Sequence, residues 1–325
     1  MKNLLYTLIC LFITTSLQAQ QIPLFSNNSD YHAILNHAVN SIHNKAFNLE
    51  TTQFLSASYR KQWAMIDDAP QTAMIRYDRL FTKLKMLGGL SLISDKTGPT
   101  SITGGNLRYA YQITLDELST LSVGLGFGVF QYRYNGSQSL LRDAYDIVGL
   151  ESSNKLIVDF NLGIYFSSQL YNGDSFFVGA SIPQLATAKI SEVKTEEDYY
   201  VYRIQHYFAN AGYYKYLEGF GGGEGASYIV ATLGLKHVPN APTQMTANVN
   251  LLMTELLWIG GGVANSFGSE SFNIDQFRFE AGFMIGDFLG FNDRLFRISY
   301  GFEKSITTYG SLPGSTHEIN LSYAF

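Results

Sequence analysis

The sequence predicts an all-β protein: a transmembrane, antiparallel, up-and-down β-barrel of about fourteen strands in a bacterial outer membrane. Composition is the first reason. The chain has 22 Tyr, 23 Phe and 30 Gly but only 7 Pro, and 15% of its residues are charged, against about 25% in soluble domains. After the first twenty residues, no uninterrupted apolar stretch approaches the about 20 residues that a membrane helix requires. Long alternating segments and an aromatic carboxyl terminus are the other two reasons.

We expect residues 1–19 to be a secretory signal peptide. Lys2 supplies a positive charge, residues 4–15 form a short apolar run, and Ala19 offers a cleavage site. The run is too short to span a bilayer as a helix. Cys10 is the only cysteine, so cleavage would leave a chain without thiols. That excludes disulfides, cysteine–zinc sites and cysteine nucleophiles.

The segment from 20 to 47 is polar and precedes the first predicted strand. It contains His32, His37 and His43, whose spacing is not that of a known metal site. We expect this segment to fold into the barrel lumen as a plug, or to lie in the periplasm and meet other proteins. The sequence indicates no cofactor.

Residues 48–325 are predicted to form the barrel because apolar and polar residues alternate along long segments. In 121–129 the odd positions are apolar and the even ones are Gly or Ser, and in 277–285 Arg278 and Glu280 oppose three phenylalanines. Such alternation predicts strands with one apolar and one polar face. A soluble sandwich would alternate too, but the predicted strands have about 9–14 residues, against about 5–6 in globular sheets.

Fourteen segments show this pattern, and an even number fits a barrel with both termini on the periplasmic side. With the first hairpin placed outside, the two longest connections, 135–154 and 183–199, both become outer loops. The predicted strands are 49–61, 71–79, 84–94, 105–115, 119–134, 155–168, 175–182, 200–214, 226–238, 243–254, 256–265, 272–286, 293–304 and 315–325. The other predicted outer loops are 62–70, 95–104, 239–242, 266–271 and 305–314.

The last strand carries the sharpest local signal, because it alternates to the end of the chain and finishes on an aromatic residue. We expect its apolar residues to face lipid and Glu318, Asn320 and Ser322 to face the lumen. A strand in lipid cannot leave its backbone amides unpaired, so this strand must close the barrel against the first one. The barrel-closing residues on the lipid side are Ile319, Leu321, Tyr323 and Phe325.

Several short passages occur in order along the chain: Leu35-Asn36-His37-Ala38, Tyr59-Arg60-Lys61-Gln62-Trp63, Pro70-Gln71-Thr72, Leu257-Trp258-Ile259-Gly260, and Gly314-Ser315-Thr316-His317-Glu318-Ile319 leading to Phe325. Together they resemble the PorP/SprF family of type IX secretion system membrane proteins, found in Bacteroidetes. They differ from the usual family pattern at His37, where that family has Pro, and at Ala264, where Arg often follows.

The resemblance implies an outer-membrane barrel that works with the type IX secretion or gliding apparatus. It implies binding of a secreted, adhesin-like cargo protein through that cargo's C-terminal sorting domain, and its delivery or anchoring. The expected partners are therefore this cargo, secretion or gliding components, and outer-membrane lipids. Nucleic acid is not an expected partner, because no basic block occurs in the sequence.

Four residues are candidates for partner binding: Asn36, Arg60, Gln62 and Trp63. Trp63 suits an anchor in a protein interface. Two structural roles compete with this interpretation, since Trp63 also suits the aromatic girdle of a barrel and Arg60 suits an ion pair in the lumen. For Trp258 we favour the girdle or the lipid face.

Catalysis is not expected, because the sequence has neither a Gly-x-Ser-x-Gly nor a His-Glu-x-x-His motif. A channel or transporter for small or hydrophobic solutes is the alternative function, since lumen faces rich in Gly, Ser and Asn suit it equally well. A barrel enzyme is the third.

Overall fold

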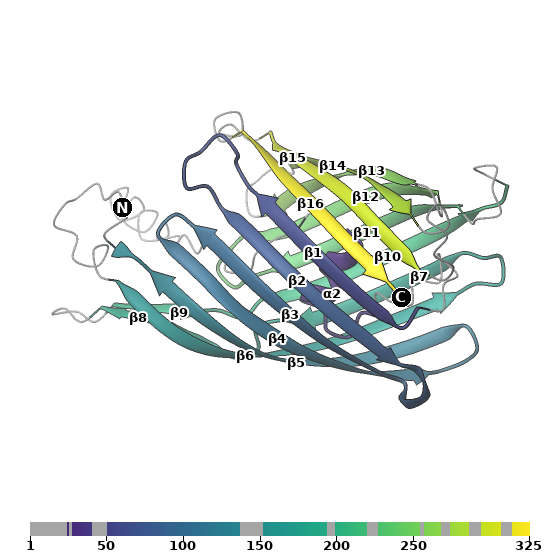
Figure 1. The fold of residues 1–325 in the computed structure, drawn as a ribbon, viewed down its shortest axis with the longest axis horizontal. Helices are drawn as coiled ribbons and strands as arrows, with labels where there is room; N and C mark the ends of the chain where they lie inside the picture. The colour runs from purple at the N-terminus through teal and green to yellow at the C-terminus, as the bar shows by residue number, and fades with distance from the viewer. Residues whose placement is uncertain are drawn as a thin grey trace, which may run out of the picture.

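Strands that follow one another along the chain pair side by side, and the sheet closes on itself as a barrel in this computed structural model (Figure 1). The structure describes residue 25 and residues 28–40, 51–136, 152–193, 199–219, 227–253, 257–267, 274–285, 294–306 and 314–325. The expected signal peptide, 1–19, lies outside these residues. No helix in the described part of the chain is long and apolar enough to cross a membrane.

Fourteen strands form the closed barrel, which confirms the predicted fold and strand number. They are β1 (Gln53–Lys61), β2 (Gln71–Phe81), β3 (Met86–Thr97), β4 (Thr100–Thr114), β5 (Ser119–Tyr134), β6 (Ser153–Gln169), β7 (Ser175–Ile182), β10 (Tyr207–Leu217), β11 (Ser227–His237), β12 (Thr243–Met253), β13 (Leu257–Phe267), β14 (Ile274–Ile285), β15 (Leu295–Ser305) and β16 (Ser315–Ala324). The described part also contains α2 (Asn28–Leu35), a short 3-10 helix η2 (Thr82–Leu84), and a separate hairpin of β8 (Ala188–Val193) and β9 (Tyr199–Arg203).

The last strand closes the barrel as the sequence predicts. β16 pairs antiparallel with β1, from Phe54 opposite Ala324 to Lys61 opposite His317. Its faces are also as predicted, since Ile319 is 51% exposed on the outside and Glu318 is 1% exposed on the inside. We call the end of the barrel that holds the carboxyl terminus, Phe325, the terminus end. The opposite end, with the β1–β2 and β15–β16 connections, is called the loop end.

The barrel has apolar side chains outside and polar ones inside, the reverse of a soluble protein. Large apolar residues such as Leu125 and Phe160 are exposed on the outer face, whereas Arg76, Asp78 and Asp159 are each at most 1% exposed inside. Water would strongly disfavour so wide an apolar surface, but lipid favours it. The soluble sandwich is therefore excluded.

The predicted outer loop 95–104 is wrong. β3 and β4 continue through it and meet at a two-residue turn, with Thr97 paired to Thr100 across Gly98 and Pro99. Gly98 takes the left-handed conformation (φ +54°) that this tight turn needs. The polar residues in 95–104 suggested a loop, but they belong to the ends of β3 and β4. At the loop end, neither face of these two strands shows the alternating apolar residues that predict a strand.

The connection after β7 also differs from the prediction. The expected strand 200–214 is divided, because β9 ends at Arg203 and β10 begins at Tyr207. β8 and β9 form a hairpin outside the barrel ladder, within and beyond the expected loop 183–199 (Figure 1). β10 then pairs with β7, so the barrel keeps its fourteen strands. Most of the other long loop, 135–154, lies outside the described residues.

Trp258 does not lie in the girdle or on the lipid face, which corrects that prediction. It points inward, is 8% exposed, and its indole Nε1 donates a hydrogen bond to Glu280 Oε1 at 2.8 Å. It belongs to an apolar cluster in the lumen toward the terminus end. The cluster consists of Phe54, Leu80, Leu87, Ala110, Tyr228, Val230, Leu252, Trp258, Met284, Leu295 and Ala324.

Candidate functional site: a segment inside the lumen and the loop end

Residues 28–40, which we call the plug segment, lie inside the barrel (Figure 1). The helix α2 ends at Leu35, and the Asn36 amide N–H completes its last turn by donating to the His32 carbonyl at 2.8 Å. Asn36 then turns the chain, because its side-chain Oδ1 accepts a hydrogen bond from the Ala38 amide at 3.0 Å. This is the local capping that asparagine favours at turns.

Asn36 also fastens the plug segment to the barrel wall. Its Nδ2 donates to the carbonyl oxygens of Ile164 on β6 (2.9 Å) and Ala180 on β7 (3.3 Å). Next to it, the Ser181 hydroxyl donates to the Leu35 carbonyl at 2.9 Å. Asn36 is 3% exposed, so this candidate residue binds the protein's own wall. A contact with a partner remains a prediction for it.

Four glycines on the inner face of the wall make room for this contact. A Cβ added at Gly124 would collide with the backbone of His37 and Ala38, and one at Gly163 would collide with the Asn36 side chain. Gly126 faces the His37 ring, and Gly179 faces Asn36 and Asn210. Glycine inside a strand marks a close approach of another backbone, and here that backbone is the plug segment.

An arginine on β4 holds the other side of the plug segment. The Arg108 Nη1 donates to the Val39 carbonyl at 3.0 Å and lies 3.4 Å from the Ala33 carbonyl. Its Nε is 2.6 Å from Asp78 Oδ1 on β2, and Arg76 Nε is 3.3 Å from the other oxygen of Asp78. A fully buried carboxylate thus fixes the guanidinium that binds the plug segment.

His37 lies in this contact as a neutral side chain. Burial, and then the positive charge of Arg108, lower the pKa of His37 from 6.5 to about 3. The ring is 3% exposed, and protonation would place a second cation beside the guanidinium. His37 therefore suits a packing role, and it is unlike a metal ligand in an open site.

Arg60 belongs to a separate ion-pair network toward the loop end. Its guanidinium contacts Glu303 on β15 at 2.5 Å and Glu318 on β16 at 3.3 Å. Arg278 on β14 lies 3.1 Å from the other oxygen of Glu303, and Asn320 donates to Glu318 at 2.9 Å. Arg60 is 4% exposed, so the network occupies the lumen, and the expected role in a lumen ion pair is observed.

Gln62 and Trp63 lie beyond this network, in the β1–β2 connection. The Gln62 amide donates to the Pro70 carbonyl at 2.9 Å, and the Trp63 amide to the Thr316 hydroxyl at 3.4 Å. Trp63 has a left-handed backbone (φ +52°), which is unusual for a large residue. Its side chain is 39% exposed, and the neighbouring Met65 and Ile66 are 77% and 43% exposed.

The structure therefore brings Arg60, Gln62 and Trp63 together at the loop end but places Asn36 elsewhere, against β6 and β7. The wall residues that hold the plug segment, Asp78 and Arg108 among them, were not predicted as site residues. Their signal in the sequence is weak. The Gly124 and Gly126 pair was a stronger signal, because glycine at every second position removes the side chains from one whole face of a strand.

The chain matches the family described as type IX secretion system membrane protein PorP/SprF over residues 38–323. No curated protein matches it. Among solved structures, the CymD monoaromatic hydrocarbon channel is similar with a TM-score of 0.50 at 8% identity, covering 92% of this chain and 93% of that one. The Pseudomonas putida toluene transporter TodX has a TM-score of 0.46 at 8% identity (94% and 99% covered), and Acinetobacter baumannii Omp33 one of 0.45 at 10% (85% and 99%).

At these identities the solved structures show the barrel fold alone. The family match covers most of the chain, including the wall, the last three residues of the plug segment (38–40) and the closing strand up to Tyr323. The chain is therefore an outer-membrane β-barrel that belongs to the PorP/SprF family of type IX secretion system membrane proteins.

Proposed function

We propose that this barrel binds a secreted, adhesin-like protein through that protein's C-terminal sorting domain and helps the type IX apparatus to deliver or anchor it. The observation that carries the proposal is the exposed apolar group at the loop end, formed by Trp63, Met65 and Ile66. An exposed apolar group on a fixed backbone is typical of a protein interface, in which Trp is a frequent anchor.

The backbone that presents this group is held at several points. The Ala64 amide donates to the Ser315 carbonyl at 2.9 Å, and the Ile66 amide donates to the Trp63 carbonyl at 3.0 Å. At the far side of the loop, the Gly98 amide donates to the Asp68 carbonyl at 3.1 Å. A preorganised loop loses little conformational entropy on binding, which favours affinity.

The lumen also favours binding over transport. Its terminus end holds the apolar cluster around Trp258, its middle holds the plug segment, and its loop end holds the Arg60 network. A solute channel, the alternative function, would need a route past all three. A barrel whose lumen holds these three groups of contacts instead suits a platform for a protein partner.

The test is a gentle-detergent pull-down of the tagged full chain from its native outer membrane, followed by mass spectrometry. We expect a secreted protein with a C-terminal sorting domain, together with type IX components. The double variant Trp63→Ala, Met65→Ser should lose the secreted protein. Tyr171→Ala is the matched control, because Tyr171 is 99% exposed at the terminus end.

All three barrels are compared for folding by their heat-dependent migration in gels. Recovery of the wild-type barrel alone would overturn the proposal. Undiminished recovery of the secreted protein by the double variant would also contradict it, since the loop-end group would then contribute nothing to binding.

A further inference from the structure

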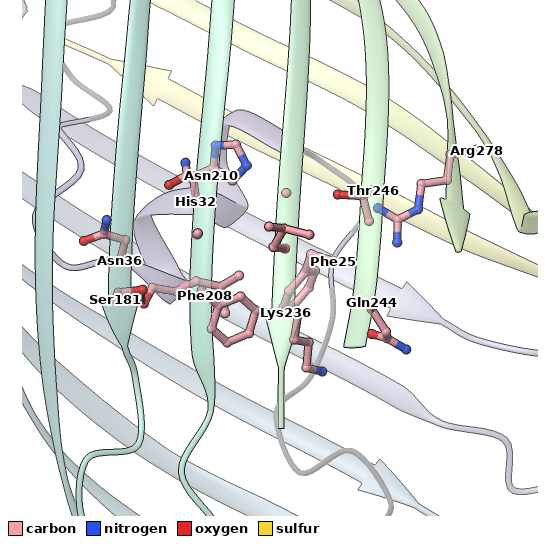
Figure 2. Close-up of a pocket in the computed structure, with 14 residues that line it drawn as sticks. Phe25, His32, Asn36, Ser181, Phe208, Asn210, Lys236, Gln244, Thr246 and Arg278 are labelled. Carbon is pink, nitrogen blue, oxygen red and sulfur yellow. Dashed lines mark hydrogen bonds between the residues drawn. The ribbon is translucent and has the colours of Figure 1, made fainter. Parts of the chain in front are cut away.

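A cavity lies between the plug segment and the inner faces of β7, β10, β11, β12 and β14 (Figure 2). One part of its lining is apolar, with Phe25 from the chain before α2 and Phe208 from β10. The other part is polar, with Lys236 from β11, Gln244 from β12 and Arg278 from β14. Figure 2 shows Lys236 reaching beneath Phe25, with Gln244 and Arg278 on the same side of the cavity.

Lys236 is the residue that most strongly indicates a ligand in this cavity. It is 6% exposed, and within the described part of the chain its Nζ has neither a hydrogen-bond acceptor nor an ion-pair partner. The Phe208 ring, 5.9 Å from Nζ, provides a weak cation–π contact. Burying an amine without a hydrogen-bond acceptor costs free energy. A ligand that brought an acceptor to Lys236 Nζ would form the missing hydrogen bond and be bound more tightly for it.

The other polar groups in the lining determine the charge of that ligand. Two of the fourteen lining residues are cationic, Lys236 and Arg278, and none is Asp or Glu. Arg278 contacts Glu303, but that carboxylate lies outside the lining. The Asn210 Nδ2 is a second buried donor without an acceptor in the described part. Two unmet donors and a positive lining favour an anion.

We propose that this cavity binds an organic monocarboxylate with a short apolar body. The carboxylate would accept from Lys236 Nζ, and the apolar body would lie between Phe25 and Phe208. Two sources share this chemistry: a free aryl- or alkyl-carboxylic acid, and the carboxyl terminus of a peptide with an apolar last residue. Because His32 and Leu35 of the plug segment also line the cavity, the ligand would hold the plug segment against the wall.

This site is distinct from the proposed loop-end interface, so it is tested on the isolated full-length barrel without a partner. Isothermal titration calorimetry with 3-phenylpropionate is compared with its neutral amide, 3-phenylpropanamide. A short peptide ending in Phe is titrated in parallel as the free acid and as the C-terminal amide. We expect an acid to bind and its amide to bind at least tenfold more weakly, because the amide lacks the anionic acceptor.

Lys236→Met should weaken binding of the acid at least tenfold. Lys304→Met is the matched control, because Lys304 is exposed on β15, and it should bind as the wild type does. Binding of the peptide acid but not of 3-phenylpropionate would identify a peptide carboxyl terminus as the source, and the reverse would identify a free acid. Failure of both acids to bind, or equal binding of acid and amide by the wild type, would overturn the proposal even if Lys236→Met does not fold.

Discussion

The Arg108 guanidinium on β4 donates a hydrogen bond to the carbonyl oxygen of Val39, 3.0 Å away in the plug segment. The residues are 69 positions apart, and a charged donor meets a main-chain acceptor inside the barrel. Because Asp78 holds the same guanidinium at 2.6 Å, the arginine is already oriented before the plug segment docks. Docking therefore requires little reorganisation of the wall.

Such a buried arrangement is sensitive to the loss of any one member. Hydrogen bonds to charged groups contribute about 1.5–3 kcal/mol, and a buried group left without its partner costs a similar amount. We expect docking of the plug segment to depend on a few side chains. It can be followed by labelling a single cysteine, Leu35→Cys, because Leu35 is 6% exposed and the only natural cysteine is Cys10, in the expected signal peptide.

Asn36→Ala should loosen the plug segment. It removes the two hydrogen bonds to the Ile164 and Ala180 carbonyls and the turn contact to the Ala38 amide. We expect docking to weaken by about 1–3 kcal/mol, measured as faster labelling of Leu35→Cys. Asn154→Ala removes the same side chain from an exposed site on β6 and serves as the control. Equal labelling rates for the two variants would contradict the role of Asn36.

Gly124→Ala should displace the plug segment without changing any polar group. The added Cβ would collide with the Ala38 amide and the His37 backbone, and overpacking of this kind costs about 1–3 kcal/mol. Gly88→Ala is the control, because its Cβ would meet only Phe81 at an ordinary contact distance of 3.6 Å. If labelling of Leu35→Cys is unchanged in Gly124→Ala, the glycine does not serve the contact.

Arg60→Met should destabilise the barrel itself. It leaves the buried carboxylates of Glu303 and Glu318 without their shared cation, and breaking a buried pair costs about 3–5 kcal/mol. We expect the heat-induced shift in gel migration to occur at a lower temperature, with partial recovery in Arg60→Met, Glu318→Gln. Lys61→Met, next along β1 and on its outer face, is the control. An unchanged transition in Arg60→Met would show that Arg278 alone supports Glu303.

Much of the barrel could be predicted because alternation is a local property of the sequence. In β16, Glu318 and Ile319 fall on opposite faces whatever the rest of the chain does, and closure follows from the need to pair every amide in lipid. The faces of β13 were harder to predict. Gly260, Gly261 and Gly262 begin two residues after Trp258, so the alternation that would have placed its side chain inside is interrupted.

The candidate site was less predictable, since its contacts join residues far apart in the sequence. Gly124 and Gly163 indicate that something approaches the wall, but their own sequence does not identify Asn36 as the neighbour. The unpaired amine of Lys236 is likewise visible only when the strands around it are placed. By contrast, Arg60, Gln62 and Trp63 adjoin in sequence and were predicted together.

Acidification should release the plug segment through His37. The docked pKa of about 3 lies below the free value of 6.5, so the undocked state binds more protons throughout this interval. Docking is therefore fully favourable above pH 6.5 and weakens as the pH falls toward 3. At pH 5, 1.5 units below the free pKa, the loss of docking free energy is at most about 2 kcal/mol, at 1.36 kcal/mol per pH unit.

The neighbouring charges act in both directions, since Arg108 and Arg76 disfavour the protonated His37 ring and Asp78 favours it. Their net effect is measured by the labelling rate of Leu35→Cys from pH 7.5 to 5, normalised to the rate of a free thiol. His37→Gln should reduce the pH dependence to the part that His32 contributes, and a variant as pH-dependent as the wild type would exclude His37 as the group responsible.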